Sequence, residues 1–457
     1  MGRRRPPAPT FRKERVMAKK LQKQKGLIVV GTRPEAIKMI PVIHALQKSE
    51  FCEPIVVGTG QHKAMVDDLF RHAGIEQATN LAAVGAGGAD LNLLWTHVID
   101  RFNDFAMAEF SGLPLDLNEG PRKVGDRPLF LMVHGDTSSS ASAAIAAFHL
   151  RIPIVHVEAG LRTNLTSSPF PEEMNRQLIG CLACLHLAPT DQNAQNLIRE
   201  QIDKQTIFVT GNTGIDALIW AGGLDLPFDQ PEIAELYDGD SKIVLITAHR
   251  RENWGGGLAA IGEGVRRLAD SHPEVSFIAP LHPNPIVREE LGTILEGCAN
   301  VLTCEPLDYG QFARLLGRCY FVITDSGGIQ EEAPALGKPV LVARETTERT
   351  EGVYAGTLEL VGTNPDLIEA AGARLLDDDA EYTKMSTAQN PYGDGHAAER
   401  IVAAAASIVA GGPLAEPFGP GYSRAAVLAA AGMPAELRHH KAGYFTLDAE
   451  DSDSTAQ

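Results

Sequence analysis

The 457-residue sequence has few cysteines, few aromatic residues and no long apolar run. No stretch approaches the roughly 18 apolar residues of a membrane-spanning helix, and no apolar segment near the start suits a secretory signal. Six cysteines without even spacing do not make a disulfide scaffold, so we expect a cytoplasmic protein in a reducing compartment. Cys181 and Cys184 lack a second pair and fall in an apolar helical run. We interpret them as core residues, and no other pattern implies a metal.

Positive charge is scarce outside the first 25 residues. Of the overall net charge of −17, that segment contributes +9, so the remainder carries −26. So acidic a surface repels polyanions, and the aromatic residues form no stripe for stacking bases, which together argue against nucleic-acid binding. We interpret residues 1–25 as a disordered leader, or as an extension before a true start at Met17. A nucleic-acid arm or a targeting peptide is the alternative.

Short aliphatic runs alternate with helical segments from residue 26 onward. The first series of predicted strands covers residues 27–30, 54–57, 129–133, 154–157 and 206–209. The second series covers residues 242–247, 275–280, 301–303, 320–324 and 339–342. Near-continuous Val, Ile and Leu runs are typical of parallel strands covered on both faces. The sequence therefore predicts two doubly wound α/β domains with a ligand site in the cleft between them.

Glycine and proline interrupt this pattern around residues 222–231, so we expect the domain break within 211–240. The predicted domains cover residues 26–210 and 211–393. Residues 411–457 resemble an appended tail, with one alanine-rich helix near 425–431 and a disordered acidic end.

Two glycine turns follow predicted strands and open predicted helices. In the first, Gly31-Thr-Arg-Pro-Glu offers free backbone N–H groups to an anion, and Arg33 and Lys38 add positive charge. Strand–glycine–helix turns are also common without any ligand. The second turn, Ser326-Gly-Gly, follows a strand ending in Asp325.

In this second turn Gly327 and Gly328 let a phosphate approach the backbone amides, and Ser326 can donate to it. Glu332 could accept hydrogen bonds from ribose hydroxyls. The alternative is an ordinary helix start with favourable acids. Neither turn is a P-loop or a Rossmann fingerprint.

Three acids stand near predicted strand ends. Asp136 lies in His-Gly-Asp-Thr, Glu158 ends the next strand, and Glu172 follows Pro171. Acids from adjacent strand ends can converge on one substrate carbon, where burial and repulsion raise a pKa for acid–base work. The alternatives are a turn residue for Asp136, a salt bridge with Arg162 for Glu158, and a helix-capping acid for Glu172.

Basic side chains follow strands of the second series. His249, with Arg250 and Arg251 beside it, could meet a phosphate or a leaving group, although a lone histidine is more often structural. His282 lies in a proline-rich loop, and Arg349 offers a further guanidinium after the strand at 339–342.

Taken together, these segments resemble the non-hydrolysing UDP-N-acetylglucosamine 2-epimerases. The resemblance rests on GTRPEAIKM (31–39), TGQH (59–62), HGDT (134–137), HVEAGLRT (156–163), SPFPEEMNR (168–176), GNTGID (211–216), AHRRENW (248–254), HPNP (282–285), TDSGGIQEEAP (324–334), RETTERTEG (344–352) and NPYGDGHAAERI (390–401). It implies a glycosyltransferase-B-like fold whose helix near 394–410 returns to the first domain. It also implies a cytoplasmic homodimer that acts on UDP-sugars without a cofactor.

The implied reaction is the interconversion of UDP-GlcNAc and UDP-ManNAc for polysaccharide biosynthesis. UDP is eliminated to give 2-acetamidoglucal and is then added back. By resemblance, the catalytic candidates are Asp136, Glu158, Glu172 and His249. The positions that match the family's UDP contacts are Arg33, Lys38, Ser326, Gly327, Gly328, Glu332 and Arg349. Positions Gln61, His62 and His282 match an allosteric UDP-GlcNAc site of some members.

Three positions depart from the family pattern. Thr350 replaces proline and could loosen the loop that holds Arg349, while Ser138 replaces threonine and His396 replaces lysine. The open alternatives are a hydrolysing epimerase, a glycosyltransferase, an epimerase of a modified UDP-sugar and a non-enzymatic UDP-GlcNAc sensor. The sequence leaves open which polysaccharide is supplied and which carboxyl group serves which face of C2.

Overall fold

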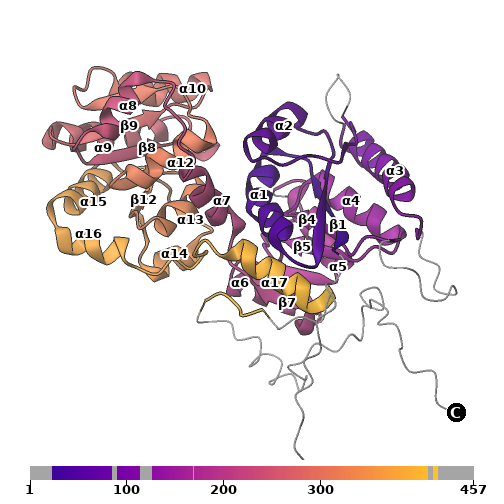
Figure 1. Ribbon diagram of the computed structural model, residues 1–457. Coiled ribbons are helices and arrows are strands. Elements are labelled where there is room, and N and C mark those ends of the chain that lie inside the picture. Colours follow the sequence, from indigo (N-terminus) through magenta and orange to yellow (C-terminus); the bar gives the residue numbers. More distant parts are fainter. Residues whose placement is uncertain (1–22, 85–89, 114–125, 168, 410–414, 420–457) are drawn as a thin grey trace, which may run out of the picture.

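The computed structural model describes residues 23–84, 90–113, 126–167, 169–409 and 415–419. They form two lobes, each a parallel sheet between helices, with α7 (Thr213–Gly222) lying between the lobes (Figure 1). The predicted fold class is confirmed. Within the described ranges, no helix combines the length and the apolar character needed to span a membrane.

The first lobe contains a seven-stranded sheet in the order β3-β2-β1-β4-β5-β6-β7. Its strands are β1 (Gln24–Val30), β2 (Cys52–Gly58), β3 (Thr79–Asn80), β4 (Leu131–His134), β5 (Ile154–Val157), β6 (Leu185–Ala188) and β7 (Ile207–Val209). Its helices are α1 (Arg33–Lys48), α2 (Lys63–His72), α3 (Leu91–Glu109), α4 (Ser138–His149), α5 (Glu172–Leu182) and α6 (Asp191–Arg199). All pairings are parallel, and Leu27 of β1 is in register with Ile55 and Leu131.

The second lobe contains a six-stranded parallel sheet in the order β10-β9-β8-β11-β12-β13. Its strands are β8 (Ile243–Thr247), β9 (Ser276–Pro280), β10 (Val301–Cys304), β11 (Phe321–Thr324), β12 (Val340–Val342) and β13 (Leu358–Leu360). Its helices after α7 are α8 (Pro231–Asp238), α9 (Gly257–Ser271), α10 (Pro285–Val287), α11 (Thr293–Leu295), α12 (Tyr309–Arg318), α13 (Gly327–Ala335), α14 (Thr350–Ala355), α15 (Pro365–Asp377) and α16 (Asp379–Ser386).

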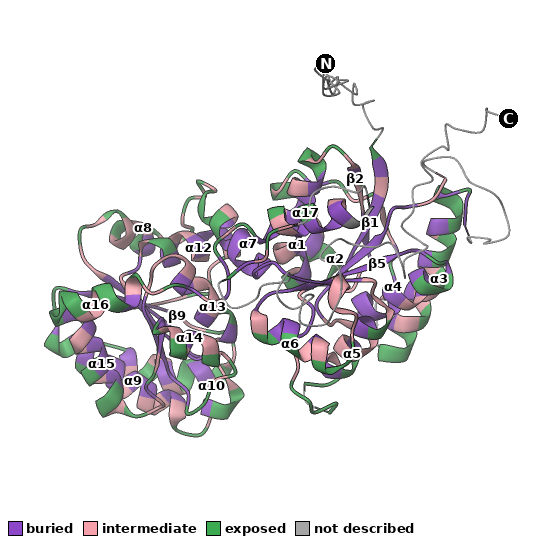
Figure 2. Ribbon diagram, turned by 90° about the horizontal axis from the view of Figure 1, so that it is seen from below, coloured by how far each residue is buried: buried purple, intermediate pink, exposed green. Residues whose placement is uncertain are grey.

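Alternation along the central strands explains their continuous hydrophobicity. In β1, Ile28 and Val30 belong to the core beneath α1, whereas Leu27 and Val29 belong to the core beneath α3 and α4. Successive side chains point to opposite faces of a strand, so both sets must be apolar when helices cover both faces. In Figure 2 the strands at the centre of each lobe are mostly coloured as buried.

The last helix, α17 (Ala397–Val409), leaves the second lobe and packs on α1 of the first lobe (Figures 1 and 2). Its residues Ala398, Ile401, Ala404 and Ala405 are buried in the core beneath α1. Beyond it, Phe418 donates its backbone N–H to Val209 O at 2.8 Å and is buried against the β7 edge. The described part of the tail, residues 415–419, is therefore attached to the first lobe. Residues 1–22 of the predicted leader and the predicted helix near 425–431 lie outside the described residues, whereas Gln24 and Lys25, which were assigned to a disordered leader, begin β1.

Both sheets reverse their strand order at one point. In the first sheet this switch lies between β1 and β4, and in the second it lies between β8 and β11. Loops leave in opposite directions at a switch point, which opens a crevice at the carboxyl ends of the strands. The loops after these four strands begin at Gly31, Gly135, Ala248 and Asp325. These loops and the helix starts that follow them contain Arg33, Asp136, His249 and Ser326–Gly328.

Candidate functional site

A cavity of about 400 Å³ lies at the switch point of the first sheet. Its lining brings together sequence-predicted residues from several loops. The lining includes Lys38, Gln61, His62, His134, Asp136, Glu158, Glu172 and Asn175. All three candidate acids therefore share one cavity, which was expected from their positions at or after adjacent strands.

Glu158 is held as an ionised carboxylate. Lys38 Nζ lies 2.5 Å from Glu158 Oε2, and His134 Nε2 lies 3.1 Å from the same oxygen. Burial of Glu158 opposes its ionisation, but the charges of Lys38 and His134 outweigh burial and lower its pKa. Arg162 binds Glu200 instead, so the alternative of a Glu158–Arg162 salt bridge is wrong. Glu158 adopts a left-handed backbone (φ 63°), which is uncommon outside glycine and frequent at functional sites.

The pKa of Asp136 is shifted in the opposite direction, upward. Burial raises its pKa, and the nearby Glu158 charge adds to this effect against the opposing charge of Arg176. Arg176 Nη2 lies 2.6 Å from Asp136 Oδ2, and Asn175 Nδ2 donates to Asp136 O at 2.8 Å. Two carboxyl groups with pKa values moved apart are a common basis for dividing acid and base roles.

Glu172 opens α5 and has an unsatisfied carboxylate oxygen. Its Oε2 is buried and has no hydrogen-bond partner within the described residues. The neighbouring Glu173 accepts from the backbone N–H groups of Thr163 and Asn164, and this fixes the preceding loop. Among the described residues Glu172 makes no such contact, so a capping hydrogen bond does not account for its place in the first turn of α5. A buried acceptor without a partner in a cavity is free to meet a ligand.

The turn after β1 is fixed by a carboxylate that the sequence reasoning missed. Glu35 accepts from the backbone N–H groups of Gly31 and Thr32 and from the hydroxyls of Thr32 and Thr137, and it shares the single hydroxyl proton of Ser140 with His134 O. The Thr32-x-x-Glu35 capping box is the signal that could have found it. These bonds join the start of α1 to the start of α4.

A second cluster forms at the switch point of the other sheet. A methyl group placed on Gly327 would lie 3.2 Å from Arg250 Nη2 and 3.2 Å from Arg349 Cζ. Both guanidinium groups therefore border the N-terminus of α13, where Ser326 makes no capping hydrogen bond. Free N–H groups with two cations beside them suit an anion such as a diphosphate. Arg250 is an addition to the predicted residues.

Asp325 holds the loop that carries His249. Fully buried, it accepts from the backbone N–H groups of His249 and Arg250 and from Asn253 Nδ2, at 2.8–3.1 Å. The His249 ring stacks on His282, with ring centroids 5.5 Å apart. Burial lowers the pKa of His249 despite the attraction of Asp325, and His282 and Arg250 lower it further. The rings of His249 and His282 therefore both lie at the loop after β8, which also carries Arg250.

Charges from the two lobes meet near Lys38. Burial opposes its protonation, but Glu158 in its own lobe and Glu331 and Glu332 in the other raise the pKa of Lys38. Glu331 also joins the lobes, because its carboxylate accepts from Asn212 Nδ2 at 2.6 Å and from Arg349 Nε at 2.9 Å. Burial raises the pKa of Glu332 to about 7.

The remaining predicted positions are spread around this site. Gln61 accepts from Ser139 Oγ at 2.7 Å, and His62 Nδ1 accepts from Arg33 N at 3.4 Å. Thr350 begins α14 directly after Arg349, whose guanidinium is held by Glu331 and Glu348. The loop carrying Arg349 is therefore fixed by ion pairs.

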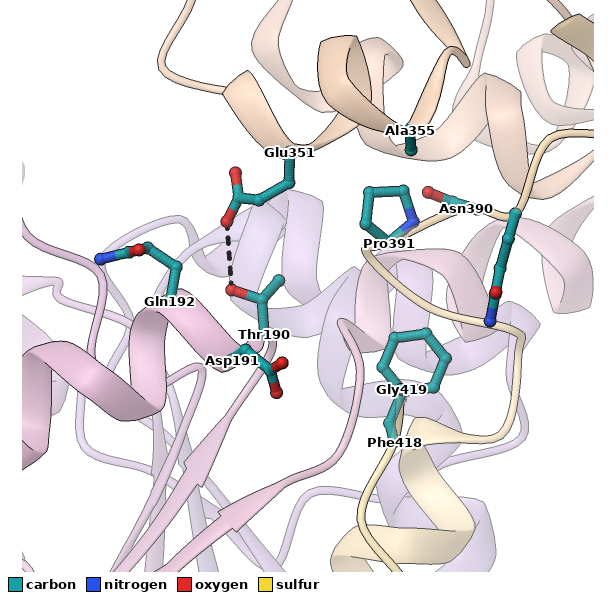
Figure 3. A pocket seen from close by; sticks show the side chains of 10 residues that line it. Thr190, Asp191, Gln192, Glu351, Ala355, Asn390, Pro391, Phe418 and Gly419 are labelled. Atoms are coloured by element: carbon teal, nitrogen blue, oxygen red, sulfur yellow. Dashed lines mark hydrogen bonds between the residues drawn. The ribbon is translucent and has the colours of Figure 1, made fainter. Parts of the chain in front are cut away.

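A separate cavity of about 400 Å³ lies between the lobes beside α6, α14 and Phe418 (Figure 3). Across it, Thr190 Oγ1 donates to Glu351 Oε1 at 3.4 Å. Pro391 and Phe418 contribute apolar surface, and none of the predicted site residues lines this cavity. We therefore assign the chemistry to the cavity at the first switch point.

The prediction that Cys181 and Cys184 are both core residues is wrong for Cys181. Cys181 is exposed, because it occupies the solvent-facing side of the last turn of α5. Cys184 lies beyond the helix end, half-buried, with Sγ 3.1 Å from Ile154 O, and burial raises the pKa of its thiol to about 12. Only Cys184 fits a packing role. Among the residues that the structure describes, no cluster of His, Cys, Asp or Glu has the arrangement of a metal site.

Comparisons with known proteins agree with this geometry. A family model described as UDP-N-acetylglucosamine 2-epimerase matches residues 122–406. The UDP-N-acetylglucosamine 2-epimerase of Yersinia pestis is 45% identical over 385 residues, which are 83% of this chain and 98% of that protein.

Solved structures lead to the same family. UDP-GlcNAc 2-epimerase from Neisseria meningitidis, bound to UDP-GlcNAc, matches with a TM-score of 0.73 and 40% identity, covering 83% of this chain and 98% of the other. The enzyme from Methanocaldococcus jannaschii, in complex with UDP-GlcNAc and UDP, matches with a TM-score of 0.61 and 28% identity over the same shares. This chain belongs to the UDP-N-acetylglucosamine 2-epimerase family.

Proposed function

We propose that this chain interconverts UDP-GlcNAc and UDP-ManNAc as a non-hydrolysing 2-epimerase. The observation that supports this most strongly is the cavity that gathers Asp136, Glu158 and Glu172 in three different environments. Lys38 connects this cavity electrostatically to α13 of the other lobe, where Arg250 and Arg349 lie. Inversion at C2, the carbon next to the sugar–diphosphate bond, requires carboxyl groups that move a proton and cationic groups that stabilise the diphosphate.

The first step is an elimination. In the α-linked GlcNAc chair, H2 and the diphosphate on C1 are both axial and anti. A carboxylate removes the proton from C2, the C–H electron pair forms the C1–C2 double bond, and the C1–O bond breaks to release UDP. Arg250, Arg349 and the start of α13 stabilise the negative charge of the departing diphosphate, and His249 lies beside them. The bound sugar is then 2-acetamidoglucal.

The second step returns the proton on the opposite face of C2 as a UDP oxygen adds to C1. We assign the proton transfers at the two faces to Asp136 and Glu172, without ordering them. Burial raises the pKa of Asp136, and Glu172 has a buried carboxylate oxygen with no hydrogen-bond partner among the described residues. Glu158 stays ionised and holds Lys38 and His134 beside the sugar. The carboxylate that removes the proton from C2 ends the turnover protonated, and the carboxylic acid that returns a proton to C2 ends it ionised. The total charge is therefore unchanged, and proton exchange with water restores the two groups.

Proton NMR of the protein with UDP-GlcNAc in D2O tests the reaction. We expect UDP-ManNAc with deuterium at C2 and little free UDP. Free ManNAc with UDP would identify a hydrolysing enzyme. An unchanged spectrum despite saturable UDP-GlcNAc binding would contradict the proposal and favour a sensor or an enzyme for a modified sugar.

Three near-isosteric variants test the residue roles. We expect Asp136→Asn, Glu158→Gln and Glu172→Gln each to fold and to bind UDP but to lose turnover, because each removes one ionisable group from the cavity. Near-normal epimerisation by any of them would remove that residue from the mechanism.

A regulatory role for Gln61, His62 and His282 is a separate proposal. Gln61 and His62 line the catalytic cavity and His282 stacks on His249, so a second UDP-GlcNAc bound there would adjoin the reacting sugar. UDP-ManNAc alone should then react slowly until a trace of UDP-GlcNAc is added. Equal rates with and without the trace would exclude such activation. We also propose a homodimer that supplies cell-surface polysaccharide precursors, and light scattering of the purified chain tests the dimer.

A further inference from the structure

The turn that carries Asp136 is held by three buried side-chain donors. The carbonyl oxygens of residues 134, 135 and 136 accept, in that order, from Ser140 Oγ at 2.8 Å, His156 Nε2 at 2.7 Å and Asn175 Nδ2 at 2.8 Å. The exposed fractions of the three donors are 0%, 1% and 3%. They belong to three different elements, α4, β5 and α5. The main chain around Asp136 is therefore fixed from three directions.

The histidine donor is suited to a permanent structural bond. A carbonyl only accepts, so Nε2 of His156 carries the proton in this contact. Burial lowers the pKa of His156 to about 3, so the ring stays neutral at working pH. Its Nδ1 is buried without a partner in the described part of the chain. The bond to Gly135 O is thus the ring's one polar contact, and Gly135 has the left-handed φ of 63° that turns Asp136 toward the cavity.

The asparagine donor connects Asp136 with the other proton-transfer candidate. Glu172 and Asn175 lie three residues apart on α5, and residues three apart share a helix face. Arg176, the next residue, binds the Asp136 carboxylate at 2.6 Å. The helix that presents Glu172 is therefore tied to Asp136 twice, once at its main-chain oxygen and once at its side chain.

We infer that Asn175 and His156 are positioning residues that fix Asp136 relative to Glu172, so that the two carboxyl groups address the two faces of one carbon. The inference rests on the proposed function, which assigns proton transfer to this pair. The N–H group of the neutral His156 ring bonds to one main-chain carbonyl, and Asn175, which lines the cavity, uses one of its two Nδ2 hydrogens on another. Placement errors of about 1 Å in a catalytic group can reduce a rate about a hundredfold.

Asn175→Leu is the direct test, because leucine has a similar size but no donor. Asn196→Leu is the matched control, since Asn196 Nδ2 makes the same kind of bond, to Gly160 O at 2.9 Å, away from the cavity. We expect Asn175→Leu to lower kcat about a hundredfold while UDP binds as tightly as to the wild type. We also expect more free 2-acetamidoglucal and UDP per turnover, since the intermediate waits longer for the second proton. The control should change none of these.

Two variants of His156 distinguish loss of its hydrogen bond from loss of folding. Glutamine can place an amide N–H near the Nε2 position, whereas methionine cannot donate. We expect His156→Gln to recover much of the kcat that His156→Met loses, with UDP affinity equal in both.

Three results would overturn the inference. The first is a kcat for Asn175→Leu equal to that of Asn196→Leu. The second is a parallel fall of kcat and UDP affinity in Asn175→Leu and His156→Met, which would show general damage to the fold. The third is a wild-type chain that binds UDP but makes no UDP-ManNAc, and this alone would remove the proposed function as well.

Discussion

Replacing Lys38 with methionine tests what sets the charge of Glu158. The two groups lie 2.5 Å apart, with side chains 27% and 13% exposed, so water screens the pair only weakly. Removing one partner of a fully buried pair costs about 3–5 kcal/mol. Because His134 stays near Glu158 and the site keeps some contact with water, we expect a loss of about 2–3 kcal/mol in the free energy of unfolding at pH 7.

The sign of the pH dependence follows from the pKa of Glu158. In the wild type this pKa is depressed, so the pair contributes stability above the unfolded-state value near 4.5, and the contribution is lost as the pH falls toward the folded-state pKa. In Lys38→Met the buried carboxyl group has lost its main cationic partner, so its pKa rises and ionisation now destabilises the fold. The difference in the free energy of unfolding between the wild type and Lys38→Met should therefore be large at pH 7 and should decrease as the pH falls below 4.5.

Denaturant unfolding at several pH values measures this difference, and Lys38→Arg is the control that retains a positive charge. The acid limb of the kcat profile should also move to higher pH in Lys38→Met, since Glu158 must then lose a proton before the site works. Equal stability of Lys38→Met and the wild type at pH 7, with an unmoved acid limb, would refute this account of the pair.

Three further changes have expected outcomes. Asp325→Ala leaves three donors without a buried acceptor, so denaturant unfolding of the second lobe should show a loss of about 3 kcal/mol or more; an unchanged midpoint would contradict this. Asp216→Ala removes the carboxylate that accepts from the first two N–H groups of α17 and should cost about 1–2 kcal/mol by the same measurement, whereas Asp216→Asn should retain part of it. Tyr309→Phe should leave the stability of the ligand-free protein unchanged or higher, because the buried hydroxyl makes no hydrogen bond within the described residues; a clear drop would reveal a partner.

The strands with uniform aliphatic sequence were predictable, and three others were not. The predicted runs at 27–30, 154–157 and 242–247 correspond to β1, β5 and β8 with small differences at their ends. The sequence analysis missed β3, β6 and β13. The first is a two-residue polar pair, and the others contain a histidine and a glutamate within short apolar segments. β3 and β13 lie at sheet edges, where an existing strand offers hydrogen bonds that the local sequence does not encode, whereas β6 pairs on both sides, with β5 and β7.

The order of residues along the chain determined which side chains reach the site. Loops after parallel strands emerge at one edge of a sheet, so Asp136 and Glu158 were expected near each other from their positions after adjacent strands. The resemblance carried the assignment further, to a family that the comparisons confirm.

Only the tertiary structure determined how the pKa of each acidic group is shifted. Glu158 and Asp136 are both acids near strand ends, yet pairing with Lys38 lowers the pKa of the first, while burial raises the pKa of the second. Partners such as Arg176 and Asn175 were visible in the sequence without a role. A pKa depends on burial and on charges a few ångströms away, and those distances are fixed only when the two switch-point crevices and their helices are packed together.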